Sequence, residues 1–379
     1  MGFAPRTAAV GPEGQGLRSS GSHLSQSLYA ALDLGTNNCR LLIARRRDGY
    51  RSLAPGTTTA AIAGRGGAEP PTLEIVDAFS RIVRLGEGLA MTGRLSDAAM
   101  ERTVSALAVC VRKLRRYRPR FARIVATEAC RRAENGGVFL ARVADELGLY
   151  LETIAPQEEA LLALAGCAAL LDPDVPRALM FDIGGGSTEL TWLAVRPGHP
   201  PLVLGWISIP LGVVNLAEAY GDATRADSGY THMNAVFAEK LLAFDHRYGI
   251  SQAIQAGGVQ MLGASGTVTT LAGIHLDLPR YDRAQVDGIR LSTDDLAAVS
   301  ARIRKMGEEA RLSHPCIGRA RSDLVIAGCA IIDAMRVLWP IPSLRIGDRG
   351  VREGILFGLM GVPAPQLAPD QPPEPPDEK

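Results

Sequence analysis

The chain has 379 residues and a mass of 40.2 kDa, and 46% of its side chains are apolar and 21% charged. These values are typical of a folded globular chain of about two domains and exclude fibrous and disordered proteins. Forty-one basic and forty acidic residues leave a net charge of +1, so no overall field attracts nucleic acid or an anionic membrane.

The two ends of the sequence have the composition of disordered segments. Residues 1–27 are rich in Gly and Ser and lack the continuous apolar core of a secretory signal, so we expect a disordered extension on a cytoplasmic protein. Residues 362–379 are rich in Pro, Asp and Glu and are expected to form a disordered tail. The longest apolar runs, 160–171 and 324–332, are shorter than the roughly 18 residues that span a bilayer, so we expect no membrane segment.

Two segments of the sequence resemble each other. Residues 31–44 and 180–193 superpose without a gap at a constant offset of 149 residues, so that Asp33 falls on Asp182 and Gly35 on Gly184. An offset of about one domain length indicates a duplication. In each copy an apolar run ends in Asp-x-Gly, a polar turn follows and a second apolar run returns, which predicts a β-hairpin.

The other expected elements follow in chain order. Residues 56–72 have the pattern of a loop, and Ser96 is the expected N-cap of a helix whose apolar residues recur every three or four positions from Met100 to Leu114. A strand is expected over 122–127, and Pro156 suits the first position of a helix that continues to Leu171. Later expectations are helices near 226–248, 266–274, 293–310 and 327–338, a strand at 343–346, and a short apolar helix after 347–354.

The six cysteines form no CxxC pair and have no neighbouring histidine. This spacing disfavours both a disulfide framework and a thiolate zinc site. We therefore expect buried, small apolar side chains at Cys39, Cys110, Cys130, Cys167, Cys316 and Cys329.

Three loops combine small residues with exposed backbone amides, which suits phosphate oxygens. Two are the hairpin tips, and the third, 263–267, precedes a helical pattern, where the helix dipole favours an anion. One such loop in isolation is equally well explained as a tight turn, but three in one chain favour phosphate binding. The candidate phosphate-binding residues are Thr36, Asn37, Asn38, Gly184, Gly185, Gly186, Ser187, Thr188, Ser265, Gly266 and Thr267.

Carboxylates lie beside or within these loops, at Asp33, Asp182 and Glu189. They would repel a phosphate unless a hard cation stood between them, so the sequence predicts a site for Mg²⁺ together with phosphate. Glu159 lies in the first turn of an expected helix, where an acidic residue is commonly a solvated partner of the helix dipole. From its position alone, this role and a catalytic one both stay open.

A basic run contains seven Lys and Arg side chains between Arg112 and Arg123. Two interpretations stay open for it. Cations at the end of a helix complement its dipole and remain solvated. The same run is also a candidate track for a long polyanion.

Six segments, in order from about residue 28 to 360, resemble exopolyphosphatases and guanosine pentaphosphate phosphatases in a short, two-domain form. The resemblance implies two ribonuclease-H-like α/β domains of the actin, Hsp70 and sugar kinase superfold around a phosphate-binding cleft. We expect an N-terminal domain over 28–156, joined by 347–361, and a C-terminal domain over 157–346. The segments are 33–40, 126–135, 158–160, 182–189, 263–267 and 352–354.

The same resemblance implies roles for single residues. Glu159 would be the general base that activates water, and Arg131 would clamp the substrate phosphate. Asp182 and Glu189 would bind Mg²⁺, with Asp33 orienting the metal or its waters. Glu128 departs from the family pattern, because many members carry a small polar residue at that position.

The function implied is a Mg²⁺-dependent hydrolase that releases orthophosphate from the ends of inorganic polyphosphate. The alternatives are a 5′-phosphohydrolase of guanosine pentaphosphate (pppGpp) and a non-enzymatic sensor of either polyanion. A sugar kinase is possible from the superfold alone, but no acceptor-sugar motif is found. The family also implies a homodimer.

Overall fold

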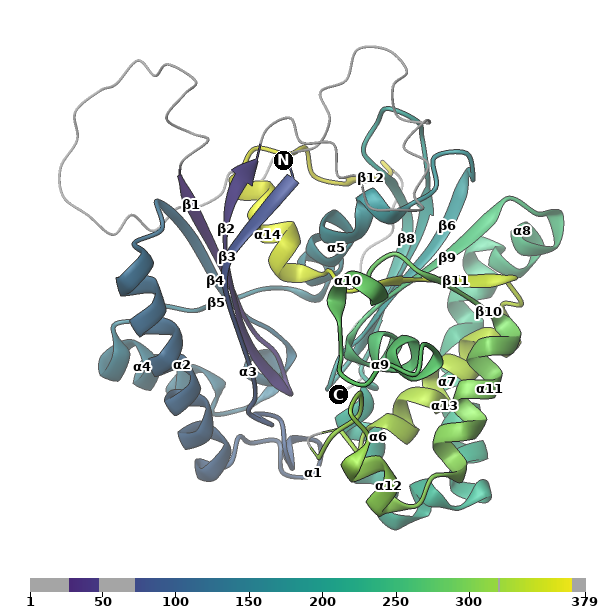
Figure 1. The fold of residues 1–379 in the computed structure, drawn as a ribbon, viewed down its shortest axis with the longest axis horizontal. Helices are drawn as coiled ribbons and strands as arrows, with labels where there is room; N and C mark the ends of the chain where they lie inside the picture. Colours follow the sequence, from purple (N-terminus) through teal and green to yellow (C-terminus); the bar gives the residue numbers. More distant parts are fainter. Residues whose placement is uncertain (1–26, 48–71, 320, 370–379) are drawn as a thin grey trace.

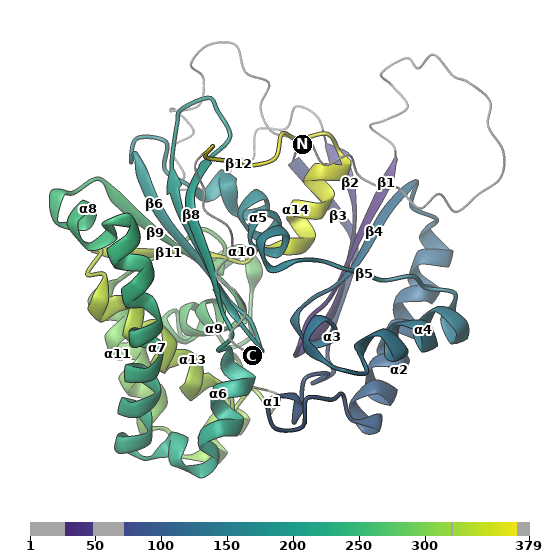
Figure 2. The ribbon, with the colours of Figure 1, turned by 180° about the vertical axis from the view of Figure 1, so that it is seen from behind.

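The computed structural model describes residues 27–47, 72–319 and 321–369. Two β-sheets face each other across two helices, α5 (Pro156–Cys167) and α14 (Val351–Leu359), and the other long helices cover the outer faces (Figures 1 and 2). Buried apolar side chains from both sheets and both central helices form one cluster in the middle layer, including Ala31, Leu164, Met180 and Ile355. Each outer layer has a separate cluster of its own.

The first sheet has the strand order β3-β2-β1-β4-β5, in which β1, β2 and β3 are antiparallel and β4 and β5 are parallel to β1. This is the ribonuclease-H-like order. Helices α2 and α4 cover its outer face (Figure 1). The elements of this half are β1 (Leu28–Leu34), β2 (Asn38–Arg47), β3 (Thr72–Ile82), α1 (Leu89–Thr92), α2 (Asp97–Tyr117), β4 (Phe121–Ala126), α3 (Glu128–Arg132), α4 (Gly136–Leu147) and β5 (Glu152–Thr153).

The second sheet repeats this arrangement. Its strand order is β10-β11-β9-β6-β7-β8-β12, and the stretch β8-β7-β6-β9-β11 has the same directions as the whole first sheet. The predicted fold class is therefore confirmed. The strands are β6 (Arg177–Ile183), β7 (Thr188–Ala194), β8 (Leu202–Ile209), β9 (Val259–Ala264), β10 (Arg290–Ser292), β11 (Ser343–Gly347) and β12 (Gln366–Leu367).

The helices of the second half lie mainly outside its sheet (Figure 2). The longest are α7 and α13, which pack on each other, and α9 begins directly after β9. No helix in the described part of the chain is long and apolar enough to cross a membrane. The helices are α6 (Val213–Tyr220), α7 (Asp227–Tyr248), α8 (Ile250–Ala256), α9 (Gly266–His275), α10 (Arg283–Val286), α11 (Thr293–Lys305), α12 (Glu308–Ser313) and α13 (Val325–Leu338).

Most expected elements are present. Both hairpins form, and their registers are equivalent, with Asp33 opposite Arg40 in one and Asp182 opposite Glu189 in the other. The Ser96 hydroxyl accepts a hydrogen bond from the Ala99 amide at 3.3 Å, as expected of the N-cap of α2. All six cysteines are free and buried, as predicted.

Four expectations differ from the structure. The helix expected over 293–310 is two helices, because the chain leaves the helical conformation at Met306 and α12 begins after Gly307. The helix from Pro156 ends at Cys167 and continues as a short 3-10 turn. Within the expected tail, 366–367 pair with 202–203 of β8, because the backbone groups along the outer side of that strand would otherwise be unpaired at the sheet edge. Thr72 of the expected loop begins β3, while 56–71, 1–26 and 370–379 lie outside the described residues.

The two central helices cross at glycines. A Cβ added to Gly166 of α5 would lie 2.2 Å from Gly350 O, and one added to Gly354 of α14 would lie 1.9 Å from Leu162 O. Only a residue without a side chain allows the two backbones to approach so closely. Helix α14 also contacts β1, β2 and β4, which agrees with the return of 347–361 to the N-terminal half. The predicted domain boundaries themselves stay predictions.

We predict that Gly354→Ala lowers the free energy of unfolding by about 1–3 kcal/mol or more, because its methyl group would overlap the Leu162 carbonyl. Gly358→Ala in the same helix is the control, since nothing lies within 4 Å of the added Cβ. That substitution should stabilise the protein by about 0.4–1 kcal/mol. Urea unfolding of both variants measures the difference, and equal effects would contradict the close crossing.

Candidate functional site

The two hairpin tips have the same turn. The amide of Gly35 donates to Asn38 O at 2.9 Å, and the amide of Gly184 donates to Ser187 O at 2.8 Å. In each hairpin an acidic residue stands one position before the end of the first strand. The turn therefore carries the carboxylate of each hairpin to the same end of the molecule.

The tips contact each other between the two sheets. A Cβ added to Gly185 would lie 3.1 Å from Thr36 Cβ and 3.2 Å from Asn37 Cβ. One added to Gly186 would lie 2.9 Å from both Thr36 Oγ1 and Glu128 Cγ. The second tip is therefore glycine-rich because the first tip leaves no room for side chains. The structure thus brings together two loops that are 149 residues apart in sequence.

Four carboxylates gather beside these tips, at Asp33, Asp182, Glu189 and Glu159. Burial, followed by the charge of Glu189, raises the pKa of Asp182 to about 7. Burial, followed by the charge of Glu189, holds the pKa of Glu159 well above its usual range. The pKa of Asp33 is also raised by burial, although Arg40 opposes the shift. The predicted metal ligands and the predicted general base are therefore close enough to repel one another.

Glu159 lies in the first turn of α5, with its carboxylate facing Arg131. Arg131 Nη1 lies 3.5 Å from Glu159 Oε2, and that oxygen is buried and has no hydrogen-bond partner in the described part of the chain. The arginine is held in place by Ile154 O at 2.6 Å and by Glu128 Oε2 at 2.6 Å. One acceptor of Glu159 is therefore left for a ligand, and a solvated helix-start acid does not describe this residue.

Glu189 is fixed by two hydroxyls. It is 5% exposed, and its Oε1 accepts hydrogen bonds from Ser187 Oγ at 2.6 Å and Ser208 Oγ at 2.9 Å. Burial raises the pKa of Glu189, and these hydrogen bonds partly offset the shift. The Ser187 hydroxyl thus orients a carboxylate in this structure.

Other predicted phosphate-binding residues have their side chains engaged. Thr188 is fully buried and its hydroxyl donates to Leu211 O at 2.8 Å. Ser265 is the N-cap of α9, and its hydroxyl accepts from the amides of Thr267 and Val268 at 3.1 and 3.3 Å. The Thr267 side chain packs against Gly328. In contrast, Asn37 Oδ1 and Asn38 Oδ1 are buried without a hydrogen-bond partner among the described residues.

Sequence reasoning missed several side chains that complete the site. Ser208 comes from β8, a strand that the sequence pattern did not predict. Glu128 was noted only as a departure, yet it holds Arg131 and its charge raises the pKa of Glu189. Arg40 belongs to segment 33–40, but the resemblance gave it no role. Its position opposite Asp33 in the first hairpin places it beside the site.

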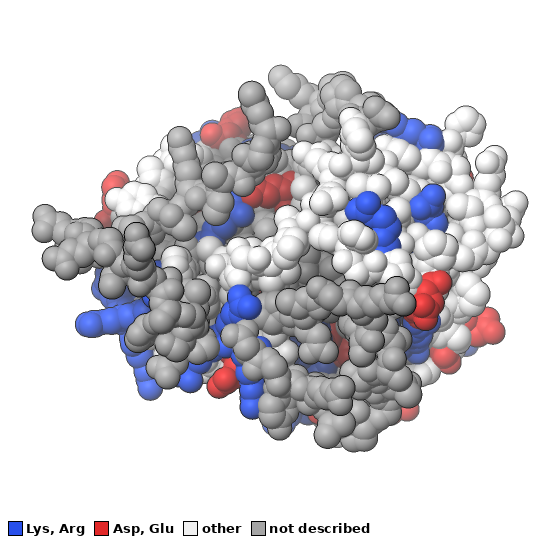
Figure 3. Space-filling view, turned by 90° about the horizontal axis from the view of Figure 1, so that it is seen from above, with Lys and Arg blue, Asp and Glu red and all other residues white. Residues whose placement is uncertain are grey.

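The basic run lies away from the tips. It includes the end of α2 and the start of β4, while the tips lie at the other end of β1, which runs parallel to β4. Six residues of strand separate the two ends by about 20 Å. Lys113 pairs with Asp77 at 2.6 Å and Arg123 with Glu152 at 3.0 Å. In the view from above, basic side chains are visible on both sides of the molecule and do not single out one half (Figure 3).

The chemistry of the acidic residues fits Mg²⁺. Within the described part of the chain, no three His, Cys, Asp or Glu side chains are arranged as a ready-made metal site. Mg²⁺ does not require one, because it is usually held by one or two carboxylates together with waters and substrate phosphates. Asp33, Asp182 and Glu189 are buried acids, and the charges of Glu189 and Asp33 both raise the pKa of Asp182; a divalent cation would offset that repulsion.

The sequence matches the profile of the Ppx/GppA phosphatase family over residues 63–362. The chain belongs to this family. Exopolyphosphatase 2 of Mycobacterium tuberculosis is 30% identical over 345 residues, which cover 88% of this chain and 98% of that protein. The crystal structure of the Aquifex aeolicus family member is 26% identical, with a TM-score of 0.67 over 88% of this chain and 97% of that chain. An exopolyphosphatase from Cytophaga hutchinsonii, 21% identical, has the same fold, with a TM-score of 0.72 over 88% and 98% of the two chains.

As a Ppx/GppA protein, the chain is a hydrolase of phosphoric anhydride bonds. The family predicted from the sequence is thereby confirmed. The roles of single residues, the homodimer and the cytoplasmic location stay predictions.

We predict that Gly186→Ala lowers kcat/KM at least tenfold, because the added methyl group would push the two tips apart at Thr36 and Glu128. Gly137→Ala is the matched control, since nothing lies within 4 Å of its added Cβ. Release of orthophosphate measures both variants, and circular dichroism confirms that each is folded. If both retain wild-type activity, contact between the tips is not needed for catalysis.

Proposed function

We propose that the protein is an exopolyphosphatase, which hydrolyses the terminal phosphate of inorganic polyphosphate with the help of Mg²⁺. The observation that carries the proposal is the pairing of Glu159 with Arg131 beside the two hairpin tips. A buried carboxylate oxygen without a hydrogen-bond partner lies 3.5 Å from a guanidinium that two other groups hold in place. The name of the mycobacterial relative supports the same substrate.

The proposed reaction uses these residues in fixed roles. Glu159 Oε2 orients a water molecule and accepts its proton, while the water oxygen forms a bond to the terminal phosphorus. The bridging P–O bond breaks, and the shortened chain leaves with the electron pair. Arg131 and the tip amides offset the charge on the phosphoryl oxygens. Mg²⁺, held by Asp33, Asp182 and Glu189, would add positive charge at the same oxygens.

The raised pKa of Glu159 agrees with the role of a base. A carboxylate that is desolvated and repelled by Glu189 binds a proton more tightly than an ordinary carboxylate does. The same residue with an ordinary pKa would be a weaker proton acceptor. Arg131 and a bound cation oppose this shift, so that the residue can still lose its proton before the next turnover.

A second candidate substrate is guanosine pentaphosphate. A cavity of about 320 Å³ adjoins the tips, lined by Asn37 from the first half and by Val214, Glu218 and Leu324 from the second. It is within the size range of small-molecule sites, roughly 300–1,000 Å³. The buried Glu218 Oε2 has no hydrogen-bond partner in the described structure and can accept from a donor such as a guanine N–H. Such a space would hold an organic group next to the phosphates.

Orthophosphate release from four substrates tests the proposal. Long polyphosphate, short polyphosphate, pppGpp and ATP should be compared side by side, with Mg²⁺ present and with a chelator. Faster release from polyphosphate than from pppGpp, lost on chelation, is the expected result. Release from pppGpp alone would replace the proposed function by the second candidate.

We predict that Glu159→Gln lowers kcat by about 100- to 10,000-fold and leaves substrate affinity within a few-fold, because the amide cannot accept a proton from water. The neighbouring Glu158→Gln is the control. Glu158 is 38% exposed and pairs with Arg123, so its loss should change kcat by less than about threefold. Hydrolysis at the wild-type rate by Glu159→Gln would remove this residue from the mechanism.

We also predict that Asp182→Asn stabilises the metal-free protein by roughly 1–3 kcal/mol at pH 8, because it removes a buried charge repelled by Glu189. The folded-state pKa of Asp182, about 7, lies above the ordinary 3.8. The repulsion is therefore fully present above pH 7, and the difference between the two proteins should shrink as the pH falls below 7.

Thermal melting with a chelator and then with Mg²⁺ measures this effect. Mg²⁺ should raise the melting temperature of the wild type more than that of Asp182→Asn, because binding to the folded state stabilises it. Equal responses to Mg²⁺ in both proteins would contradict the assignment of Asp182 as a metal ligand.

A further inference from the structure

The first hairpin tip is held by the segment that follows β3, residues 83–88. The amide of Arg84 donates to Asn37 O at 3.1 Å. The amide of Gly86 donates to Thr36 O at 2.9 Å, and a Cβ added to this glycine would lie 2.3 Å from Thr36 Cγ2. Only a residue without a side chain fits so close to the tip. The 83–88 segment and the first tip therefore form one packed unit.

The second hairpin tip is held in an equivalent way by the start of α6, which follows β8. The amide of Val214 donates to Gly185 O at 2.8 Å. The Asn215 side chain donates through Nδ2 to Gly186 O at 2.8 Å. Strand β8 has the place in the second sheet that β3 has in the first. In each half, therefore, the segment after the third strand binds the backbone carbonyls of the tip.

Contacts between the two halves link these segments. Arg84 forms a paired contact with Asp323, which comes shortly before α13: its Nη1 lies 2.9 Å from Oδ2, and its Nη2 donates to Oδ1 at 3.0 Å. The amide of Gly88 donates to Glu218 Oε1 of α6 at 3.0 Å. The lining of the 320 Å³ cavity includes Arg84, Glu218 and Asp323 together with Asn37 of the first tip. The two halves are thus joined directly beside the tips.

Arg84 has an uncommon backbone conformation. Its φ is 49°, in the left-handed region that glycine and asparagine adopt most readily. An arginine is unfavourable at such a turn unless its side chain has a use. Arg102 of α2 supports the turn, because its Nε donates to Val83 O at 3.1 Å and its guanidinium pairs with Glu87 at 2.6 Å. The turn is thereby fixed on the first half, and the Arg84 guanidinium reaches the second.

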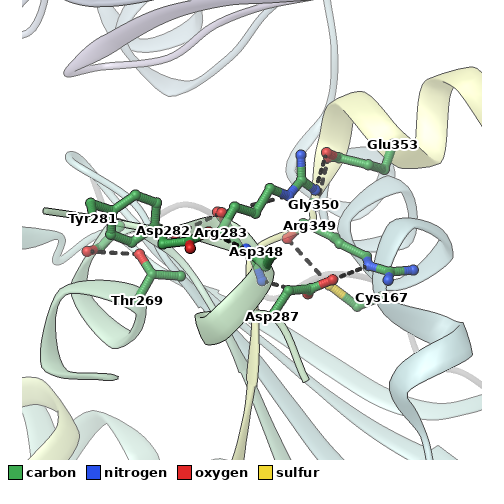
Figure 4. A network of polar contacts seen from close by, with 12 residues as sticks. Cys167, Thr269, Tyr281, Asp282, Arg283, Asp287, Asp348, Arg349, Gly350 and Glu353 are labelled. Atoms are coloured by element: carbon green, nitrogen blue, oxygen red, sulfur yellow. Dashed lines mark hydrogen bonds and ion pairs between the residues drawn. The ribbon is translucent and has the colours of Figure 1, made fainter. Parts of the chain in front are cut away.

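The halves have another junction at the start of α14, shown in Figure 4. Tyr281 Oη donates to Asp348 Oδ2 at 2.6 Å, and Arg283 pairs with Glu353 at 2.9 Å. This network fixes the start of α14 on the second half, while the helix contacts β1 and β2 of the first. In Figures 1 and 2, α14 lies in the middle of the molecule, whereas α1, directly after the 83–88 segment, lies near its lower edge. The junction beside the tips is therefore separate from the central one.

We propose that the ion pair of Arg84 with Asp323 positions the two hairpin tips against each other, with the hydrogen bond from the Gly88 amide as a second contact. The inference rests on the proposed function, because the substrate is taken to be a phosphate chain whose end contacts both tips. The two side chains of the pair are 33% and 46% exposed, so the pair contributes little to folding stability. Its role is to keep the free protein in the arrangement that binds substrate.

Steady-state kinetics with tripolyphosphate tests this role. Arg84→Gln and Asp323→Asn should each raise KM about 3- to 10-fold, because the binding-competent arrangement is less populated without the pair. They should change kcat by less than about twofold, because bound substrate draws the tips together again. The double variant should be no worse than either single one, since both remove the same interaction.

Arg94→Gln is the matched control for these variants. Arg94 pairs with Glu134 at 3.1 Å, and both residues are exposed and belong to the first half. Loss of this pair removes an arginine of similar exposure without releasing one half from the other. It should leave both KM and kcat within about twofold of the wild type.

A distance measurement reports on the arrangement without turnover. Spin labels at Val138→Cys and Val337→Cys mark the two halves, because these side chains are 73% and 69% exposed and the six native cysteines are buried. In a Glu159→Gln background, Arg84→Gln should broaden or shift the distance distribution between the labels. Tripolyphosphate with Mg²⁺ should restore the distribution of the parent protein, and Arg94→Gln should not alter it at any stage.

The positioning role and the proposed function fail in different ways. The role is overturned if Arg84→Gln leaves the distance distribution unchanged, or if Arg94→Gln alters KM and the distances as much. If the wild type releases no orthophosphate from any polyphosphate but the distances respond to Arg84→Gln as expected, the function is wrong and the positioning role stands. If polyphosphate is hydrolysed and the distances do not respond, the function stands and the positioning role is overturned.

Discussion

Repulsion among buried carboxylates is the constraint on which the site depends. Asp33, Asp182, Glu189 and Glu159 are desolvated together, and their charges act on one another. Such a cluster is unfavourable unless cations and hydrogen bonds compensate it. The surroundings supply several: hydroxyls on Glu189, Arg131 beside Glu159, and Arg40 opposite Asp33. One oxygen of Glu159 still has no hydrogen-bond partner among the described residues, so the compensation is incomplete.

The two similar hairpins place both a cationic and several anionic side chains in one site. The registers of the two hairpins are equivalent, so Arg40 in the first occupies the position of Glu189 in the second. The first hairpin therefore places a cation opposite its aspartate, and the second places another carboxylate there. The two hairpins thus differ in charge at one equivalent position, +1 in the first and −1 in the second. Two identical hairpins would have placed charges of one sign opposite both aspartates.

The parts of the site that could be predicted from sequence are those fixed by local geometry. The Asp-x-Gly motif indicates a turn that needs small residues, and Ser96 indicates the N-cap of a helix. Residues whose role depends on convergence could not be found in this way. Glu128 and Ser208 lie on different elements, and nothing near either one in the sequence indicates that both act on Glu189.

Sequence patterns also misjudge side chains that have two uses. Thr188 is a residue type expected in a phosphate-binding loop, yet its hydroxyl donates a hydrogen bond to Leu211 O within the second half. The strand β8 was missed because its apolar residues lack a regular alternation, and with it the role of Ser208. In both cases the deciding partner comes from a segment more than 15 residues away, which a local pattern does not contain.

The position of α14 has a consequence for how the chain folds. This helix, Val351–Leu359, packs on β1, whose residues are made more than 300 positions earlier. As the chain leaves the ribosome, the first sheet acquires its outer helices early but keeps its inner face uncovered until almost the whole of the described chain has been synthesised. Contacts between residues so far apart in sequence form late. Until they form, the exposed apolar surface can associate with other chains and aggregate. The first half of the chain is therefore translated first, but its fold is completed only when α14 packs on its sheet.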